Sequence, residues 1–181
     1  AYGTALAGLG DTMIWVADAL RAVSGGAIDL HVAEPGVAAP ATGVFAAVAS
    51  GAVPAGYSWM GFEAEIVPAA PLFGGAPFGL GSEDFLAWME FHGGRALLDR
   101  AFAPHGVRPI PCGTAPAEAA GWFRAPLTGP QDLEGLAFRA LGLGGEVLAE
   151  LGAEVTAQPG GSLVRALAEG EVAAAEFLLP S

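Results

Sequence analysis

The chain has 181 residues, of which 53% are hydrophobic and 14% charged, and its formal net charge of −12 includes seven arginines and no lysine. This length suits one generous domain or two small ones, and the apolar content argues against disorder. The apolar runs are too short and too interrupted by Gly and Pro to span a bilayer, and the acidic balance argues against a surface for nucleic acid or anionic lipid.

Helix and strand patterns alternate in the first third of the chain. Residues 11–23 place apolar side chains on one helical face and end at Ser-Gly-Gly. The stretch "AIDLHVA" (27–33) alternates apolar and polar residues, which predicts a half-buried strand. A helix over 42–50 and a strand over "VPAGYSWM" (53–60) are expected next.

The strongest helix pattern covers residues 82–102, with Ser82 as its N-cap, and Gly93-Gly94 can divide it in two. The later elements are expected as a strand at 107–114, a strand at 136–143, a helix at 146–152, a strand at 154–158, a helix at 162–170 and a strand at 172–178. Strands that alternate with helices favour an α/β fold with a mostly parallel sheet.

Three familiar kinds of site fit the sequence poorly. "LGLGG" (141–145) could begin a dinucleotide-binding turn, but Val147 stands where a third glycine should be and Glu146 would repel phosphate. Cys112 and His105 lack any nucleophile signature, so the lone cysteine is predicted to be a buried free thiol at a strand end. The three histidines are scattered, which argues against a zinc site.

Three charged residues stand in apolar surroundings: Arg139 in "GLAFRALGLG", Glu118 in "CGTAPAEAAGWF" and Glu176 in the closing strand. One interpretation is a structural ion pair between Arg139 and either glutamate, because an unpaired buried guanidinium is costly. The other is a concave site in which the arginine clamps a carboxylate and the two glutamates hold a cation. Its apolar walls would be Trp59, Phe78, Trp122 and Phe177.

Four longer stretches carry a family resemblance. They are "AGYSWMGFEAEIVPAAPLFGGAPFG" (55–79), "PIPCGTAPAEAAGWFRAPL" (109–127), "DLEGLAFRALGLGGEVLAELGAEV" (132–155) and "PGGSLVRALAEGEVAAAEF" (159–177). In this order and spacing, the chain resembles the extracytoplasmic solute-binding proteins of tripartite ATP-independent periplasmic (TRAP) transporters, of the DctP type. It is most similar to the branch that binds small monocarboxylic or keto acids.

The resemblance implies a role for each charged residue. Arg139 matches the arginine that holds the ligand carboxylate. Glu176 matches the acid that coordinates a metal ion bridging to the ligand, with the carbonyl oxygen of Phe177 as a further donor. Glu118 lies where relatives often carry Gln as a cation or ligand contact. Trp59 and Phe78 fall in segments that line the pocket, whereas Trp122 is expected to be structural or close to a hinge.

Two departures from the family pattern concern the cation. Where relatives commonly read D-A-x-E-W, this chain has "AAAEF" at 173–177, so the preceding Asp is missing and Phe replaces Trp. Glu118 in place of Gln adds a negative charge. Because more anionic oxygens suit Ca²⁺, we expect calcium to be preferred over sodium as the bridging ion, with no organic cofactor.

The resemblance also implies an architecture: a two-lobed α/β protein of the periplasmic-binding type, with mixed sheets flanked by helices. The expected first lobe is 1–117 and the second 118–175, with 176–181 crossing back to the first. The chain is expected to be partial, because members run to about twice this domain-sized length.

The expected function is to capture a 2-keto or 2-hydroxy monocarboxylate in the periplasm and deliver it to TRAP permease subunits, without catalysis. The resemblance leaves a homodimer open. The alternative from the residues alone is a small α/β enzyme acting on a carboxylate, with Glu118 or Glu176 as general base near Arg139.

Overall fold

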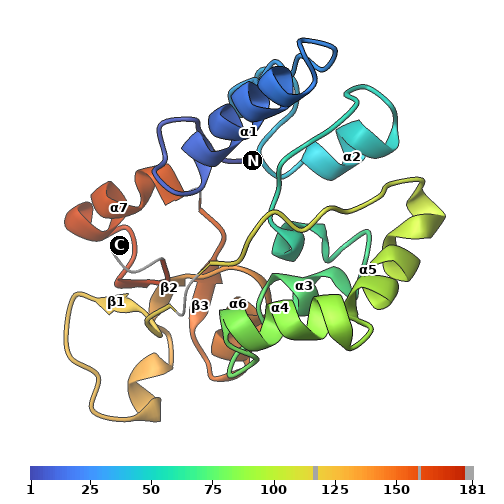
Figure 1. Ribbon diagram of the computed structural model, residues 1–181. Coiled ribbons are helices and arrows are strands. Elements are labelled where there is room, and N and C mark those ends of the chain that lie inside the picture. The colour runs from blue at the N-terminus through green and yellow to red at the C-terminus, as the bar shows by residue number, and fades with distance from the viewer. Residues whose placement is uncertain (116–117, 159, 178–181) are drawn as a thin grey trace.

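The computed structural model describes residues 1–115, 118–158 and 160–177 (Figure 1). Its α-helices are α1 (Gly10–Val23), α2 (Val44–Ala49), α3 (Ala70–Gly74), α4 (Ser82–Phe91), α5 (Gly94–Phe102), α6 (Gly142–Glu150) and α7 (Leu163–Glu169). The 3-10 helices are η1 (Met60–Glu63), η2 (Ala103–His105), η3 (Pro130–Leu133) and η4 (Gly160–Ser162). The strands are β1 (Trp122–Phe123), β2 (Ala137–Arg139), β3 (Glu154–Thr156) and β4 (Ala174–Ala175). None of the helices in these ranges combines the length and apolar character needed to cross a membrane.

One mixed sheet contains the four strands, in the order β1-β4-β2-β3. β2 runs parallel to both of its neighbours, β3 and β4, whereas β1 pairs antiparallel with β4. The last residue of β2, Arg139, pairs with Thr156 on one side and Ala175 on the other. The carboxyl ends of three parallel strands therefore meet at Arg139, and such an edge is where open α/β sheets bind ligands.

The described chain has two hydrophobic cores. The first is built from α2 to α5 and the segment before α3, and its buried side chains are Phe45, Val67, Ala70, Met89, Leu98 and Phe102. The second lies on the sheet, around Phe138, Ala140, Ala153 and Ala174. The segment that follows η2 runs from the first group of helices to the sheet (Figure 1). Two cores joined in this way fit the predicted two-lobed architecture.

The predicted lobe boundaries stay predictions. Residue 117, the expected end of the first lobe, lies outside the described residues, as do 178–181 of the expected crossover.

An edge-to-face aromatic pair builds the centre of the second core. Phe138 on β2 is fully buried, and its ring centroid lies 5.5 Å from that of Phe123 on β1, with an interplanar angle of 87°. Gly121 makes this contact possible, because a Cβ there would lie 2.7 Å from Cζ of Phe138 and 3.0 Å from Cζ of Phe123. The glycine of the "GWF" triplet is thus required by packing.

Three predicted strands are wrong: 27–33, 53–60 and 107–114 are not strands in the structure. A strand needs a neighbour to complete its backbone hydrogen bonds, and these segments have no ladder partner within the described residues. Two prolines, Pro109 and Pro111, also remove N–H donors from the third segment. In 27–33, alternation of apolar and polar residues is therefore not sufficient for a strand, because no neighbouring strand in the described part of the chain pairs with the segment.

Other differences concern where elements begin and end. The helix pattern at 82–102 divides into α4 and α5 at Gly93, which adopts a left-handed φ of 88°. Ser82 is the first residue of α4 and not its N-cap; Gly81 holds that position and the Ser82 hydroxyl donates to the carbonyl of Ala115 at 3.3 Å. The predicted burial of Cys112 is wrong as well, because the residue is exposed and lies in a segment without helix or strand.

Short elements also departed from the expected pattern. Helix α3 and strand β1 were not predicted, and β4 occupies only the middle of the expected 172–178 strand, of which residue 178 lies outside the described part. Helix α6 begins at Gly142, four residues before the expected 146. The remaining helices, near 11–23, 42–50 and 162–170, are confirmed.

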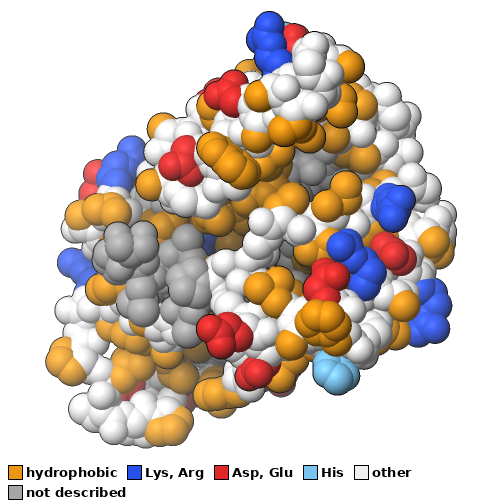
Figure 2. All heavy atoms as spheres, viewed as in Figure 1, with side chains coloured by type: hydrophobic (Ala, Val, Ile, Leu, Met, Phe, Trp, Pro, Cys, Tyr) orange, Lys and Arg blue, Asp and Glu red, His pale blue; other side chains and the backbone are white. Residues whose placement is uncertain are grey.

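Helix α1 lies at the outside of the molecule. The predicted face of Met13, Val16, Ala17 and Leu20 is partly buried, but Gly10 is the only buried residue of the helix. Trp15 is 70% exposed and Val23 is 82% exposed. Figure 2 shows hydrophobic side chains gathered over this helix and toward the middle of the same face.

Candidate ligand- and cation-binding site

Arg139 is the central charged residue of the candidate site. It ends β2, the strand between β4 and β3, and only 3% of the residue is exposed. Burial lowers the pKa of its guanidinium, while the carboxylates of Glu176 and Glu118 act in the opposite direction. The positive charge of Arg139 is thus held at the carboxyl edge of the sheet, and the neighbouring carboxylates offset the cost of its desolvation.

Backbone carbonyls fix the orientation of this guanidinium. Nε donates to the carbonyl oxygen of Gln158 at 2.9 Å, and Nη1 donates to that of Glu176 at 2.8 Å. These carbonyls follow β3 and β4, so the two flanking strands hold one guanidinium between them. Nη2 has no hydrogen-bond partner among residues 1–115, 118–158 and 160–177. It can donate two N–H groups to a ligand carboxylate.

The ion pair left open by the sequence is present between Arg139 and Glu176. Nη1 lies 3.3 Å from Oε2 of Glu176, whose side chain is 25% exposed. The ring of Phe177 stacks near the same group, with its centroid 5.9 Å from Cζ of Arg139. Phe177 also packs on Gly160, where a Cβ would lie 2.6 Å from Cε2 of the ring. Phe177 therefore shields one side of the guanidinium.

Glu118 lies close enough to interact with both members of this ion pair. Burial, a side-chain hydrogen bond with Glu176 and repulsion by its charge raise the pKa of Glu118 from 4.5 to about 7, while Arg139 opposes the rise. Two carboxylates in hydrogen-bond contact share a proton, because both cannot ionise at such a distance without a cation. Glu118 is nevertheless an exposed residue, so solvent reaches the carboxylate pair.

The donor set fits a hard cation. It offers oxygens only, from the carboxylates of Glu118 and Glu176, and a cation between them would replace the shared proton. Within the described residues no group of three or more His, Cys, Asp or Glu side chains forms a metal site. An ion held here would therefore need further oxygens from main-chain carbonyls, water or the ligand itself.

Trp59 approaches the same edge of the sheet from the first group of helices. Its Nε1 donates to the carbonyl oxygen of Gly74 at 2.7 Å, and its ring packs edge-on against Phe62. The far side of the indole touches Gly142, the first residue of α6 and the third after Arg139. The structure thus brings Trp59 near the charged group.

The other two predicted aromatic walls contribute less. Phe78 has a left-handed φ of 57° and a fully exposed side chain, so it covers none of the charged groups. Trp122 lies on β1 opposite Ala175 and is 42% exposed. The roles of both residues in ligand binding stay predictions.

Sequence reasoning missed two contributors: the carbonyl of Gln158 and the bare backbone of Gly142. A main-chain carbonyl leaves no signal in residue types. Gly142 was noted only as part of "LGLGG", because its contact with Trp59 depends on two segments more than 80 residues apart. Only the tertiary structure could have shown either one.

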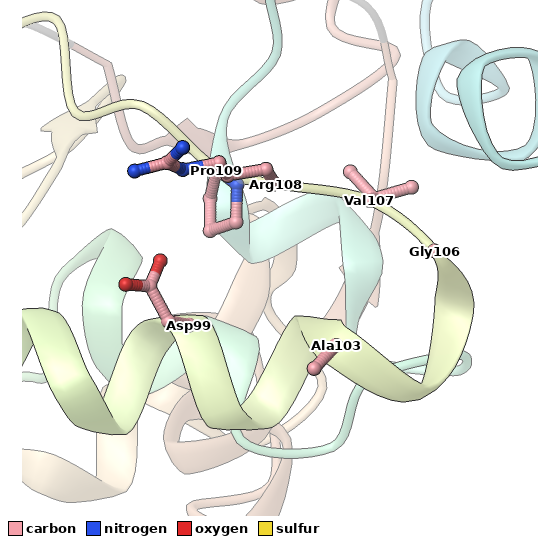
Figure 3. Close-up of a pocket in the computed structure, with 6 residues that line it drawn as sticks. All are labelled: Asp99, Ala103, Gly106, Val107, Arg108 and Pro109. Carbon is pink, nitrogen blue, oxygen red and sulfur yellow. The ribbon is translucent and has the colours of Figure 1, made fainter.

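A separate cavity of about 360 Å³ lies between α5 and the segment after η2 (Figure 3). It is lined by Asp99, Ala103, Gly106, Val107, Arg108 and Pro109. Asp99 and Arg108 stand on opposite sides of it, and one Asp99 carboxylate oxygen is buried without a hydrogen-bond partner among the described residues. Arg139, Glu118, Glu176, Phe177 and Trp59, called the Arg139 group below, do not line this cavity.

Comparison with known proteins decides the family. Residues 12–181 match the model of the bacterial extracellular solute-binding proteins, family 7 (DctP). The chain belongs to this family.

Individual relatives agree with the DctP assignment. A monocarboxylate 2-oxoacid-binding periplasmic protein of Nostoc sp. is 32% identical over 165 residues, which cover 91% of this chain and 45% of the relative. The TRAP periplasmic solute-binding protein of Pseudoalteromonas atlantica, crystallised with sodium and pyruvate, is 28% identical with a TM-score of 0.88. That of Colwellia psychrerythraea, crystallised with calcium and pyruvate, has the same identity and TM-score.

This DctP chain spans about half the length of these relatives. Each of the two crystal structures is covered to 54%, while 98% of this chain is matched. The predicted two-lobed α/β architecture of the periplasmic-binding type is thereby confirmed as a partial one. The Arg139 group lies within the matched segment.

Proposed function

We propose that this chain belongs to an extracytoplasmic receptor that captures a small 2-oxo or 2-hydroxy monocarboxylate and delivers it to a TRAP membrane permease. The observation that carries the proposal is the fixed, buried guanidinium of Arg139, which keeps Nη2 for a ligand beside the paired carboxylates of Glu118 and Glu176. Such an arrangement recognises an acid together with a cation.

The proposed binding mode divides the ligand between two partners. Arg139 would bind the ligand carboxylate, and Glu118, Glu176 and the carbonyl oxygen of Phe177 would hold a cation that supplies further positive charge for the oxygens of the ligand. Two relatives with pyruvate and either sodium or calcium bound support this mode. The additional charge of Glu118 favours calcium here.

The proposed roles of the aromatic side chains follow their positions. Phe177 shields the guanidinium, and Trp59 closes the site from the first lobe; Phe78 would reach a ligand only after a rearrangement, because it is fully exposed. We place the lobe boundary between 117 and 118. Ligand binding would favour the closed arrangement, which the permease would recognise.

Calorimetry on protein freed of metal by chelation tests the proposal. Pyruvate, lactate and a longer 2-oxoacid should bind in the presence of calcium, and a dicarboxylate or a sugar acid should bind far more weakly. Arg139→Gln removes the charge and should abolish binding of the monocarboxylates, whereas Arg165→Gln, at an exposed arginine of α7, should leave it unchanged. If no monocarboxylate binds with calcium or with sodium, the proposal is wrong.

A further inference from the structure

The indole of Trp59 is held in one orientation by the first group of helices. Nε1 donates to the carbonyl of Gly74 at 2.7 Å, and the ring of Phe62 meets it edge-on at 5.3 Å and 87°. A Cβ at Gly61 would lie 2.2 Å from the ring, and one at Gly74 would lie 3.0 Å from Nε1. The ring therefore cannot shift toward its own lobe without breaking packed contacts.

The six-membered ring of the indole, which packs on Gly61, also meets the second lobe at one glycine. A Cβ at Gly142 would lie 2.8 Å from Cη2 of Trp59, which is closer than two carbon atoms can approach. Gly142 begins α6, three residues after Arg139 at the end of β2, and its φ is 56°. The indole thus touches the lobe beside the proposed ligand site.

We infer that Trp59 and Gly142 form the stop that sets how far the two lobes close over the ligand. The contact joins the two lobes, so it exists only in the closed arrangement. Because Gly142 has no side chain, the two lobes can approach this closely. This inference rests on the proposed function, because closure matters only if a ligand is enclosed. It makes Gly142 a positioning residue for ligand binding.

A methyl group at this point should act on the closed form alone. The left-handed backbone of Gly142 would strain an alanine in open and closed forms alike, so that strain cancels in the affinity. The overlap with the indole would be present only in the closed form and would lower its population. Gly142→Ala should therefore weaken ligand binding by about tenfold or more, as overpacking of a tight contact does.

A double-mutant cycle between the two residues tests the stop. Pyruvate affinity in saturating calcium would be measured for the full chain, Gly142→Ala, Trp59→Phe and the double variant. Phenylalanine lacks the outer ring that carries Cη2, so in that background Gly142→Ala should cost no more than about twofold. Trp59→Phe alone should weaken binding, because the closed form loses a wall.

Two glycines serve as matched controls. Gly144 lies in the same helix and Gly135 has a similar φ of 70°, and a Cβ at either would have nothing within 4 Å. Gly144→Ala tests a change in α6 without the contact, and Gly135→Ala tests left-handed strain without it. Both should bind pyruvate within about twofold of the parent chain.

Each result separates this inference from the proposed function. If the parent chain binds pyruvate and Gly142→Ala binds as tightly, or loses as much affinity in the Trp59→Phe background, the stop is refuted and the function stands. If no acid binds to the parent chain, the proposed function is refuted. Thermal unfolding of the same four proteins then still tests whether Trp59 and Gly142 are in contact. Coupling between the two substitutions in that measurement supports the contact, and its absence refutes it.

Discussion

Glu118→Gln should weaken the preference of the site for calcium over sodium. The substitution keeps the shape of the side chain and an amide oxygen, but removes the negative charge that Glu118 carries once its proton has left. In the folded chain that proton leaves only near pH 7, because burial and the Glu176 carboxylate disfavour the second charge. A bound cation instead favours the ionised form of Glu118, and a divalent ion favours it more strongly than a monovalent ion does.

The magnitude follows from the charge of the ion. Two unit charges in contact near a protein surface interact by about 4 kcal/mol, and the partial exposure of Glu118 reduces this to about 1 to 2 kcal/mol. In Glu118→Gln the affinity for sodium should therefore fall by about tenfold, and the affinity for calcium, which carries twice the charge, by about a hundredfold. The preference for calcium over sodium should fall by about tenfold or more in Glu118→Gln.

Calorimetry of chelator-treated protein gives both affinities, each measured in the presence of pyruvate. Glu171→Gln is the matched control, because Glu171 is exposed and lies outside the Arg139 group, so its calcium preference should equal that of the parent chain. Equal losses of calcium and sodium affinity in Glu118→Gln would refute the charge argument. Tighter pyruvate binding in sodium than in calcium by the parent chain would refute the expected preference itself.

Three further results are expected. Between pH 4.5 and about 7 the folded chain holds a proton on Glu118 that the unfolded chain has released, so thermal stability without metal should fall as the pH rises through this window, and calcium should reduce the fall; stability that rises there would contradict the assignment. Arg139→Lys keeps the charge but loses the planar donor group, so pyruvate affinity should fall by at least about tenfold, and calorimetry showing a change below about threefold would exclude a clamp. Gly121→Ala should lower the free energy of unfolding in urea by about 1 to 3 kcal/mol through contact with Phe138, whereas Gly113→Ala, with open space around it, should change it by less than about 0.5 kcal/mol.

The charged residues of the site could be predicted from the sequence because they stand in apolar surroundings. Arg139 and Glu176 lie within otherwise apolar runs, and a buried charge needs a partner, so an ion pair of Arg139 with one of the two glutamates could be expected; the structure identifies Glu176. Helices could be predicted because a helix makes its backbone hydrogen bonds within its own segment, and the apolar residues of its buried face recur at a fixed spacing in the sequence.

The wrong strands and the missed contacts share one physical cause. A strand is defined by its neighbour, and no property of "AIDLHVA" (27–33) states whether a partner exists. The two-residue β1 is a strand because Ala174 and Ala175 lie beside it. The carbonyl of Gln158 and the bare backbone of Gly142 likewise act through distant segments. Such contacts cannot be deduced from the local pattern.

The order of the strands explains why one arginine can hold the site ready before a ligand arrives. Arg139 ends the strand between β3 and β4, so the carbonyls that follow those strands, from Gln158 and Glu176, both reach its guanidinium. An arginine side chain that is mobile before binding would lose about 2 kcal/mol of conformational entropy when it binds a ligand, but folding has already fixed the side chain of Arg139. Nη2 is therefore kept in place for a carboxylate, and the ligand gains the whole of that interaction.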